Sequence, residues 1–361
     1  MSFADPKHMF HPTALPLCMM VLATAMALPA SADLTWKAVW VWSMPNKTDQ
    51  DMACMAQTAQ SLGFNTVLAL PPRDRIPALI EECHQRGMSL YLSTVFSGGD
   101  ASWRQVMTSE QEARVKLPFG VDYQIGGQPV SSDESLQSPL PCWNRPEVRE
   151  MCAKKVRDLA SLGADGLAFD CVGYRNYRRC HCALCEAELA EYRAAHPELD
   201  ADTAEACWAE DVLVDFNNAM AAVAREAKPG IWLTTHVYPV FLPNPYYGYR
   251  LNLHYTGETV SWFFRPHWSL DTVRERTRHI VGRQGTVWPG QTAAPFVAFD
   301  ARKHRDYRSA RRIRQELRVV KESGASALQM AELGYILQYP GVARAVAREL
   351  GGDFQAQKAS N

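Results

Sequence analysis

One arrangement of polar and apolar positions recurs along the chain from residue 33 onward. An amphipathic helical pattern is followed by a glycine and then by a short run of apolar residues. A glycine can adopt the left-handed conformation that ends a helix, and apolar runs without alternation are typical of strands buried on both faces. Strands that alternate with helices predict a parallel sheet. The glycines of this pattern are Gly63, Gly87, Gly163, Gly230 and Gly324.

The apolar runs predict eight strands. The first is residues 38–42, and the strands after the five glycines are 64–70, 88–93, 163–170, 231–236 and 325–331. From β propensity we expect the sixth strand at 259–264, and the seventh at either 285–288 or 294–298. This order predicts an α/β fold, a single-domain (β/α)8 TIM-type barrel over residues 33–350. The alternative is an open doubly wound sheet, but no Gly-x-Gly-x-x-Gly turn follows the first strand.

Long connections follow the third, fourth and fifth predicted strands. Residues 98–143 and 238–257 are rich in turn-forming residues. Because the loops after the strands build the catalytic face of a barrel, long loops there predict function. The Gly-rich, polar tail at 351–361 is predicted to be frayed.

The N-terminus has the pattern of a signal peptide, which we place at residues 1–32. Lys7 and His8 precede an apolar run over 15–28, and small residues at 30–32 precede a predicted cleavage before Asp33. We therefore expect a secreted or periplasmic protein, and we expect no membrane span once the signal is removed. The 38 basic and 39 acidic residues give a net charge of -1, so the balance favours no nucleic-acid partner.

Polar and aromatic residues at the ends of the predicted strands are the candidate site. Asp170 ends a buried strand, where a carboxylate needs a partner or a function. For the second carboxylate we consider Glu332, after the last strand, and Glu258, whose position depends on where the sixth strand begins. Two carboxylates with aromatic rings are what glycoside hydrolysis uses. The candidate substrate-binding residues are Trp42, His236, Tyr238, Arg265, His267 and Trp268.

Nine cysteines remain after removal of the predicted signal, three of them in the run Cys180-x-Cys182-x-x-Cys185. These three could bind a structural zinc with Cys142, His181 or Cys171 as the fourth ligand. In an exported protein they could equally form disulfides, for example from Cys142 to the run. Both interpretations give the run a structural role beside Asp170. We expect no catalytic metal, since no His-x-His or His-Glu-x-x-His occurs.

Three segments together resemble TIM-barrel glycoside hydrolases of the hypothetical glycosyl hydrolase type. They are Cys-Trp-Asn-Arg-Pro-Glu-Val-Arg-Glu at 142–150, Gly-Ala-Asp-Gly-Leu-Ala-Phe-Asp at 163–170, and the cysteine run at 180–185. The resemblance implies a carbohydrate substrate. In similar retaining barrels the acid that ends the fourth strand is the nucleophile, which implies this role for Asp170 and an acid/base role for Glu332 or Glu258. The alternative is an exported sugar-binding barrel that is not an enzyme and has lost the acid pair.

Overall fold

The fold is known from a computed structural model. It describes residues 33–42, 48–96, 101–106, 123–125, 128–130, 140–170, 172–174, 179–237, 247–261, 267–299 and 308–355. The predicted signal peptide therefore lies outside the described residues.

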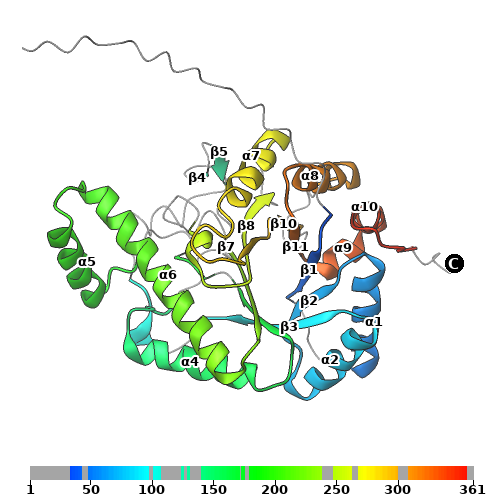
Figure 1. Cartoon of the computed structure of the whole chain (residues 1–361), viewed down its shortest axis with the longest axis horizontal. Coiled ribbons are helices and arrows are strands. Elements are labelled where there is room, and N and C mark those ends of the chain that lie inside the picture. The colour runs from blue at the N-terminus through cyan, green and yellow to red at the C-terminus, as the bar shows by residue number, and fades with distance from the viewer. Residues whose placement is uncertain are drawn as a thin grey trace, which may run out of the picture.

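Eight parallel strands close into a barrel at the centre of the molecule (Figure 1). Each strand pairs in parallel with its two neighbours, and the ring closes because the last strand pairs with the first. This confirms the predicted TIM-type barrel. In order round the ring the strands are β1 (Trp36–Val41), β2 (Thr66–Ala69), β3 (Ser89–Val95), β6 (Gly166–Asp170), β7 (Trp232–Val237), β8 (Tyr255–Ser261), β10 (Phe296–Ala298) and β11 (Ala327–Ala331).

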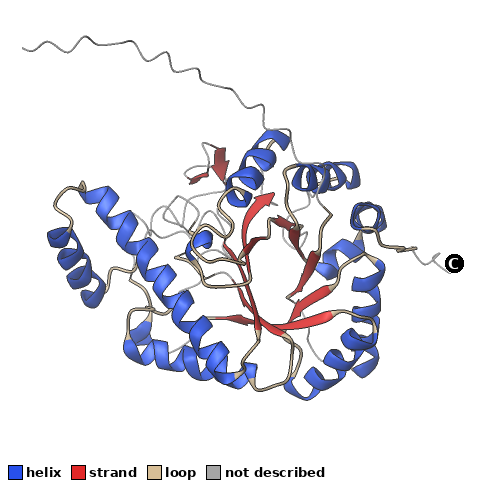
Figure 2. Cartoon of the chain, viewed as in Figure 1, coloured by secondary structure: helices blue, strands red, loops and turns tan. Residues whose placement is uncertain are grey.

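Helices surround the barrel, as Figure 2 shows. Most of them pack on the strands through one continuous apolar layer, while α5 packs on the outer side of the long α6. The helices are α1 (Asp49–Ser61), α2 (Ile76–Gln85), α4 (Pro146–Ala160), α5 (Ala183–Ala195), α6 (Ala201–Ala227), α7 (Leu270–Val281), α8 (Ala310–Glu322), α9 (Leu333–Gln338) and α10 (Pro340–Leu350). Short elements complete the chain: the 3-10 turns η1 (Arg73–Arg75), η2 (Ala101–Trp103) and η5 (Gly248–Arg250), the antiparallel pair β4 (Tyr123–Ile125) and β5 (Gln128–Val130), and β9 (Thr292–Ala293), which pairs with β8.

Local sequence signals explain where the helices begin and end. Thr48 and Asp51 form a capping box at the start of α1, and Ser309 caps the first turn of α8. Gly163 ends the connection after α4 with a φ of 90°, the left-handed conformation that the sequence pattern predicted. The other four glycines of the pattern also have positive φ.

Two of the predicted boundaries need correction. The sixth strand is not 259–264, because β8 begins four residues earlier, at Tyr255, where it pairs with β7. The alternative of 294–298 for the seventh strand is confirmed by β10, while residues 285–288 form turns. Within the predicted frayed tail, Phe354 N–H donates a hydrogen bond of 2.9 Å to Ser61 O, so residue 354 is held against the barrel, and residues 356–361 lie outside the described residues.

Alternation along the strands separates two apolar clusters. One fills the barrel and includes Trp40, Tyr91, Ala168 and Phe296; the other fills the space between the strands and the helices. A side chain at a given strand position therefore points either into the barrel or out toward a helix. This alternation decides which of the candidate residues can meet.

Candidate active site

Asp170 and His236 meet inside the barrel, at the carboxyl ends of adjacent strands. They are partners in the register of β6 and β7, and Asp170 Oδ1 lies 3.5 Å from His236 Nε2. The Asp170 side chain is 12% exposed, whereas the His236 side chain is fully buried. The acid is therefore accessible from the mouth of the barrel, and the histidine lies beneath it.

Aromatic rings enclose His236. The edge of the ring of Trp40 contacts it at 4.8 Å between centroids, and Phe296 stacks on it at 4.4 Å. Burial among these rings lowers the pKa of His236 to about 3. The imidazole is therefore neutral at neutral pH, and it can donate a hydrogen bond toward the Asp170 carboxylate without adding a positive charge.

A network of buried polar groups lies below this pair, and the sequence pattern did not predict it. Gln329 lies fully buried in β11 and accepts a hydrogen bond of 2.9 Å from Trp40 Nε1. Its amide nitrogen donates to Thr234 Oγ1 at 3.1 Å and to Thr235 O at 3.0 Å. The network connects β1, β7 and β11 across the barrel. A lone glutamine within the apolar run 325–331 was the signal in the sequence.

Glu258 is buried on the opposite side of the same sheet. Gly257 faces the barrel, where a Cβ would lie 3.2 Å from the side chain of Gln329, so Glu258 points outward to α7. There it forms a buried ion pair with Arg276. Burial raises the pKa of Glu258 to about 7, although the Arg276 charge opposes this shift. The structure does not bring Glu258 together with Asp170.

Glu332 directly follows β11. This strand lies four places from β6 in either direction round the ring, so β11 and β6 are on opposite sides of the barrel. Glu332 is 3% exposed, and its carboxylate caps α9, because Glu332 Oε2 accepts a hydrogen bond of 3.1 Å from Tyr335 N. Glu332 therefore lies at the carboxyl end of the barrel, on the side opposite Asp170.

The predicted substrate-binding residues have different surroundings. Trp42 is partly buried and packs against the cluster inside the barrel. Trp268 belongs to the same cluster and is 2% exposed, with the Arg276 guanidinium 4.4 Å from the centre of its ring. His267 is partly buried beside it. Tyr238 and Arg265 lie outside the described residues.

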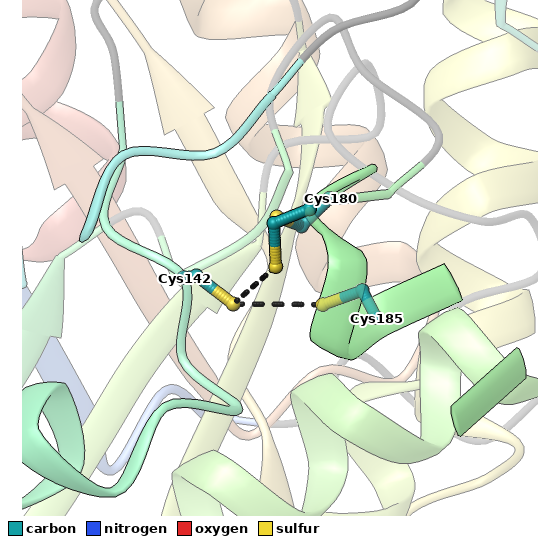
Figure 3. A group of neighbouring side chains, drawn as sticks. Cys142, Cys180 and Cys185 are labelled. Atoms are coloured by element: carbon teal, nitrogen blue, oxygen red, sulfur yellow. Dashed lines mark hydrogen bonds between the residues drawn. The ribbon is translucent and has the colours of Figure 1, made fainter. Parts of the chain in front are cut away.

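Four buried cysteines gather beside the loop that follows β6. The sulfur atoms of Cys142, Cys180, Cys182 and Cys185, which we call the cysteine cluster, all lie within 4.8 Å of one another. Figure 3 shows the side chains of Cys142, Cys180 and Cys185 pointing toward a common centre. His181 instead contacts Glu186, at 3.0 Å, and Cys171 lies outside the described residues.

Comparison with known proteins shows which solved structures are similar to this chain. No family model matches the sequence, and no curated protein matches it closely enough to count as a relative. Among solved structures, it is similar to the glycoside hydrolase domain of PgaB (BpsB) from Bordetella bronchiseptica. The identity is 12%, the match covers 87% of this chain and 98% of that one, and the TM-score is 0.55.

Two further solved structures are also similar to the chain at low sequence identity. The catalytic domain of a β-amylase from Paenibacillus polymyxa is 10% identical, with 90% and 100% of the two chains covered and a TM-score of 0.54. A β-galactosidase from Halorubrum lacusprofundi is 14% identical, and the match covers 88% of this chain but 57% of that one, with a TM-score of 0.58. The chain thus spans little more than half of the β-galactosidase.

The part of the chain that the structure describes contains no helix with the length and hydropathy of a membrane span. The chain has the TIM-barrel fold found in these glycoside hydrolases, as the resemblance in its sequence implied.

Proposed function

We propose that the chain is an exported glycoside hydrolase that acts on an oligo- or polysaccharide. One observation carries the proposal: Asp170, at the carboxyl end of β6, presents a partly exposed carboxylate to the barrel mouth and contacts the neutral, buried His236. The reacting groups of TIM-barrel enzymes lie at this end of the strands. The fold shared with glycoside hydrolases supports carbohydrate as the substrate class.

In the proposed retaining mechanism, Asp170 is the nucleophile. An Asp170 oxygen forms a bond to the anomeric carbon as the glycosidic C–O bond breaks, and the leaving oxygen takes a proton from a second carboxylic acid. That second group then removes a proton from water, which attacks the same carbon and releases Asp170.

For the second carboxylic acid we propose Glu332 rather than Glu258. Glu332 comes from the strand opposite β6, so a sugar bound in the mouth would lie between it and Asp170. Glu258 points away from the mouth and is paired with Arg276. A retaining pair needs its carboxyl groups about 5 to 5.5 Å apart on either side of the bond that is cleaved.

A non-catalytic sugar-binding barrel is the second candidate. The observation in its favour is the hydrogen bond by which Glu332 caps α9, because a carboxylate held in a cap serves the fold. In that case the mouth would bind sugar through Asp170 and Trp42 without cleaving it.

A screen of aryl glycosides and bacterial polysaccharides, with release of aglycone or reducing ends as the signal, tests the proposal. Asp170→Asn should abolish any activity of the mature chain that begins at Asp33. Asp165→Asn is the matched control, because Asp165 precedes the same strand at its far end, where it accepts a hydrogen bond of 2.9 Å from Leu90 N. Full activity in Asp170→Asn would contradict the proposal, and binding without cleavage by the wild type would favour the second candidate.

A further inference from the structure

The cysteine cluster has the geometry of a metal site. Cys142 Sγ lies 3.7 Å from Cys182 Sγ and 3.5 Å from Cys185 Sγ, and all four sulfur atoms lie within 4.8 Å of one another. A tetrahedral Zn²⁺ with Zn–S bonds of about 2.3 Å places its sulfur atoms about 3.8 Å apart. The observed spacing therefore leaves room for one ion at the centre.

Hydrogen bonds around the sulfur atoms suit charged thiolates. The backbone N–H of Asn144 donates to Cys142 Sγ, and that of Cys182 donates to Cys180 Sγ, so the same contact from residue i+2 occurs twice. The side-chain amide of Asn144 lies 3.6 Å from Cys185 Sγ. Donors of this kind stabilise metal-bound thiolates and fix their orientation.

Disulfides account for the cluster less well. All four cysteines are free thiols in the structure, and none is more than 7% exposed. One disulfide from Cys142 would leave two thiols buried beside it, and a second disulfide would have to close within the short run 180–185. A single Zn²⁺ uses all four sulfur atoms and neutralises half of their charge. We propose that the cysteine cluster binds one structural Zn²⁺ through four thiolates.

The ion would join two loops at the mouth of the barrel. Cys142 belongs to the connection after β3, and the other three ligands follow β6. The neighbouring Trp143 packs on Tyr174 with 5.6 Å between ring centroids, and Tyr247 Oη donates a hydrogen bond of 2.6 Å to Val172 O. Residues 172–174 are thus held between the site and the connection after β7. The zinc site therefore positions the segment that directly follows Asp170 and takes no part in the reaction.

The metal content of the purified chain tests this inference without any assay of activity. Prepared without chelator, the wild type should contain about one zinc per chain, and Cys185→Ser should lose at least tenfold in metal content. Cys54→Ser is the control, because Cys54 is an exposed thiol on α1, and it should keep the metal. Asn144→Ala should bind Zn²⁺ about 10- to 100-fold more weakly in chelator competition, because it removes a donor to a ligand.

If Cys185→Ser does not fold, the absorption spectrum of the Co²⁺-substituted wild type still tests the inference. Four thiolates around Co²⁺ give intense thiolate-to-metal charge-transfer bands and the visible bands of tetrahedral Co²⁺. Two results would overturn the inference: a wild type that binds neither Zn²⁺ nor Co²⁺, with the four sulfur atoms as disulfides or free thiols, or a folded Cys185→Ser that keeps its metal. Neither result bears on the role proposed for Asp170.

Discussion

Asp170 and Glu258 are two carboxylates on opposite sides of one sheet, the first partly exposed and the second buried. Asp170 points into the barrel and contacts a histidine that burial keeps neutral. Glu258, two strands away on β8, points out to α7 and pairs with Arg276. The outward acid has a fixed cation and little access to solvent, so it stabilises the packing of a helix on the barrel. The inward acid is 12% exposed and remains accessible to a ligand at the barrel mouth.

The side of the sheet therefore separates the two roles more sharply than burial does. A shift of one residue in the register of a strand would exchange inward and outward positions. In β8 the register is fixed by Gly257, because a Cβ there would lie 2.1 Å from Ala294 O. Variants of Asp170, Glu258 and His236 test whether the inward and outward carboxylates differ in this way.

The largest effect is expected from Asp170→Asn. Loss of the nucleophile should lower kcat by about 10³-fold or more, on a substrate found by the screen, with little change in Tm. In Asp170→Gly, added azide should restore turnover by attacking the anomeric carbon from the vacated side. A loss of less than tenfold in Asp170→Asn would remove Asp170 from the mechanism.

Glu258→Ala should show the opposite result. Removing the side chain beyond Cβ leaves the buried Arg276 guanidinium without its partner and costs about 3 to 5 kcal/mol in the free energy of unfolding. Because Glu258 faces the helices, kcat should change by less than about threefold, equivalent to about 0.7 kcal/mol. Denaturant unfolding and initial rates measure the two effects, and a stable but inactive variant would place Glu258 in the site.

His236→Gln should have an intermediate effect on catalysis. His236 Nε2 lies 3.5 Å from Asp170 Oδ1 in a position to orient the carboxylate, and a hydrogen bond to a charged group contributes about 1.5 to 3 kcal/mol, or about 10- to 100-fold in kcat. Comparison of kcat with KM shows which step is affected. A change in KM alone would instead assign His236 to substrate binding.

A separate effect, on stability and not on catalysis, is expected in the pH dependence of unfolding. Burial raises the pKa of Glu258 to about 7 in the folded chain, above the unfolded value of about 4.3. Protonation therefore favours folding, and this contribution is complete below pH 4.3 and lost as the pH rises to about 7. Glu258→Gln should consequently show a flatter dependence of Tm on pH in this window than the wild type. Parallel curves would contradict the shift.

The sequence was sufficient to predict the barrel because its signals are local. Glycine after a helix and a short apolar run after the glycine identified most of the strands. The sixth strand was misplaced because the β-branched and aromatic residues at 259–264 have higher β propensity than Gly257 and Glu258. Pairing with β7 and β10 overrides that preference and moves the strand four residues toward the N-terminus.

The site was less predictable, because it depends on contacts between distant residues. Asp170 could be singled out, since an acid at the end of a buried strand is conspicuous. The outward direction of Glu258 could not be determined, because one residue of register decides it. Trp40 and Gln329 are 289 positions apart, and no local pattern shows that they meet. The cysteine run was evident, but the choice of Cys142 over His181 as its partner required the fold.

Trapping the glycosyl-enzyme would identify the nucleophile directly. The wild type would be incubated with a 2-deoxy-2-fluoro glycoside of the sugar found by the screen, digested, and analysed by peptide mass spectrometry. We expect one added sugar per chain, attached to Asp170 and absent from Asp170→Asn. A label on Glu258, Glu332 or any other residue would contradict this expectation.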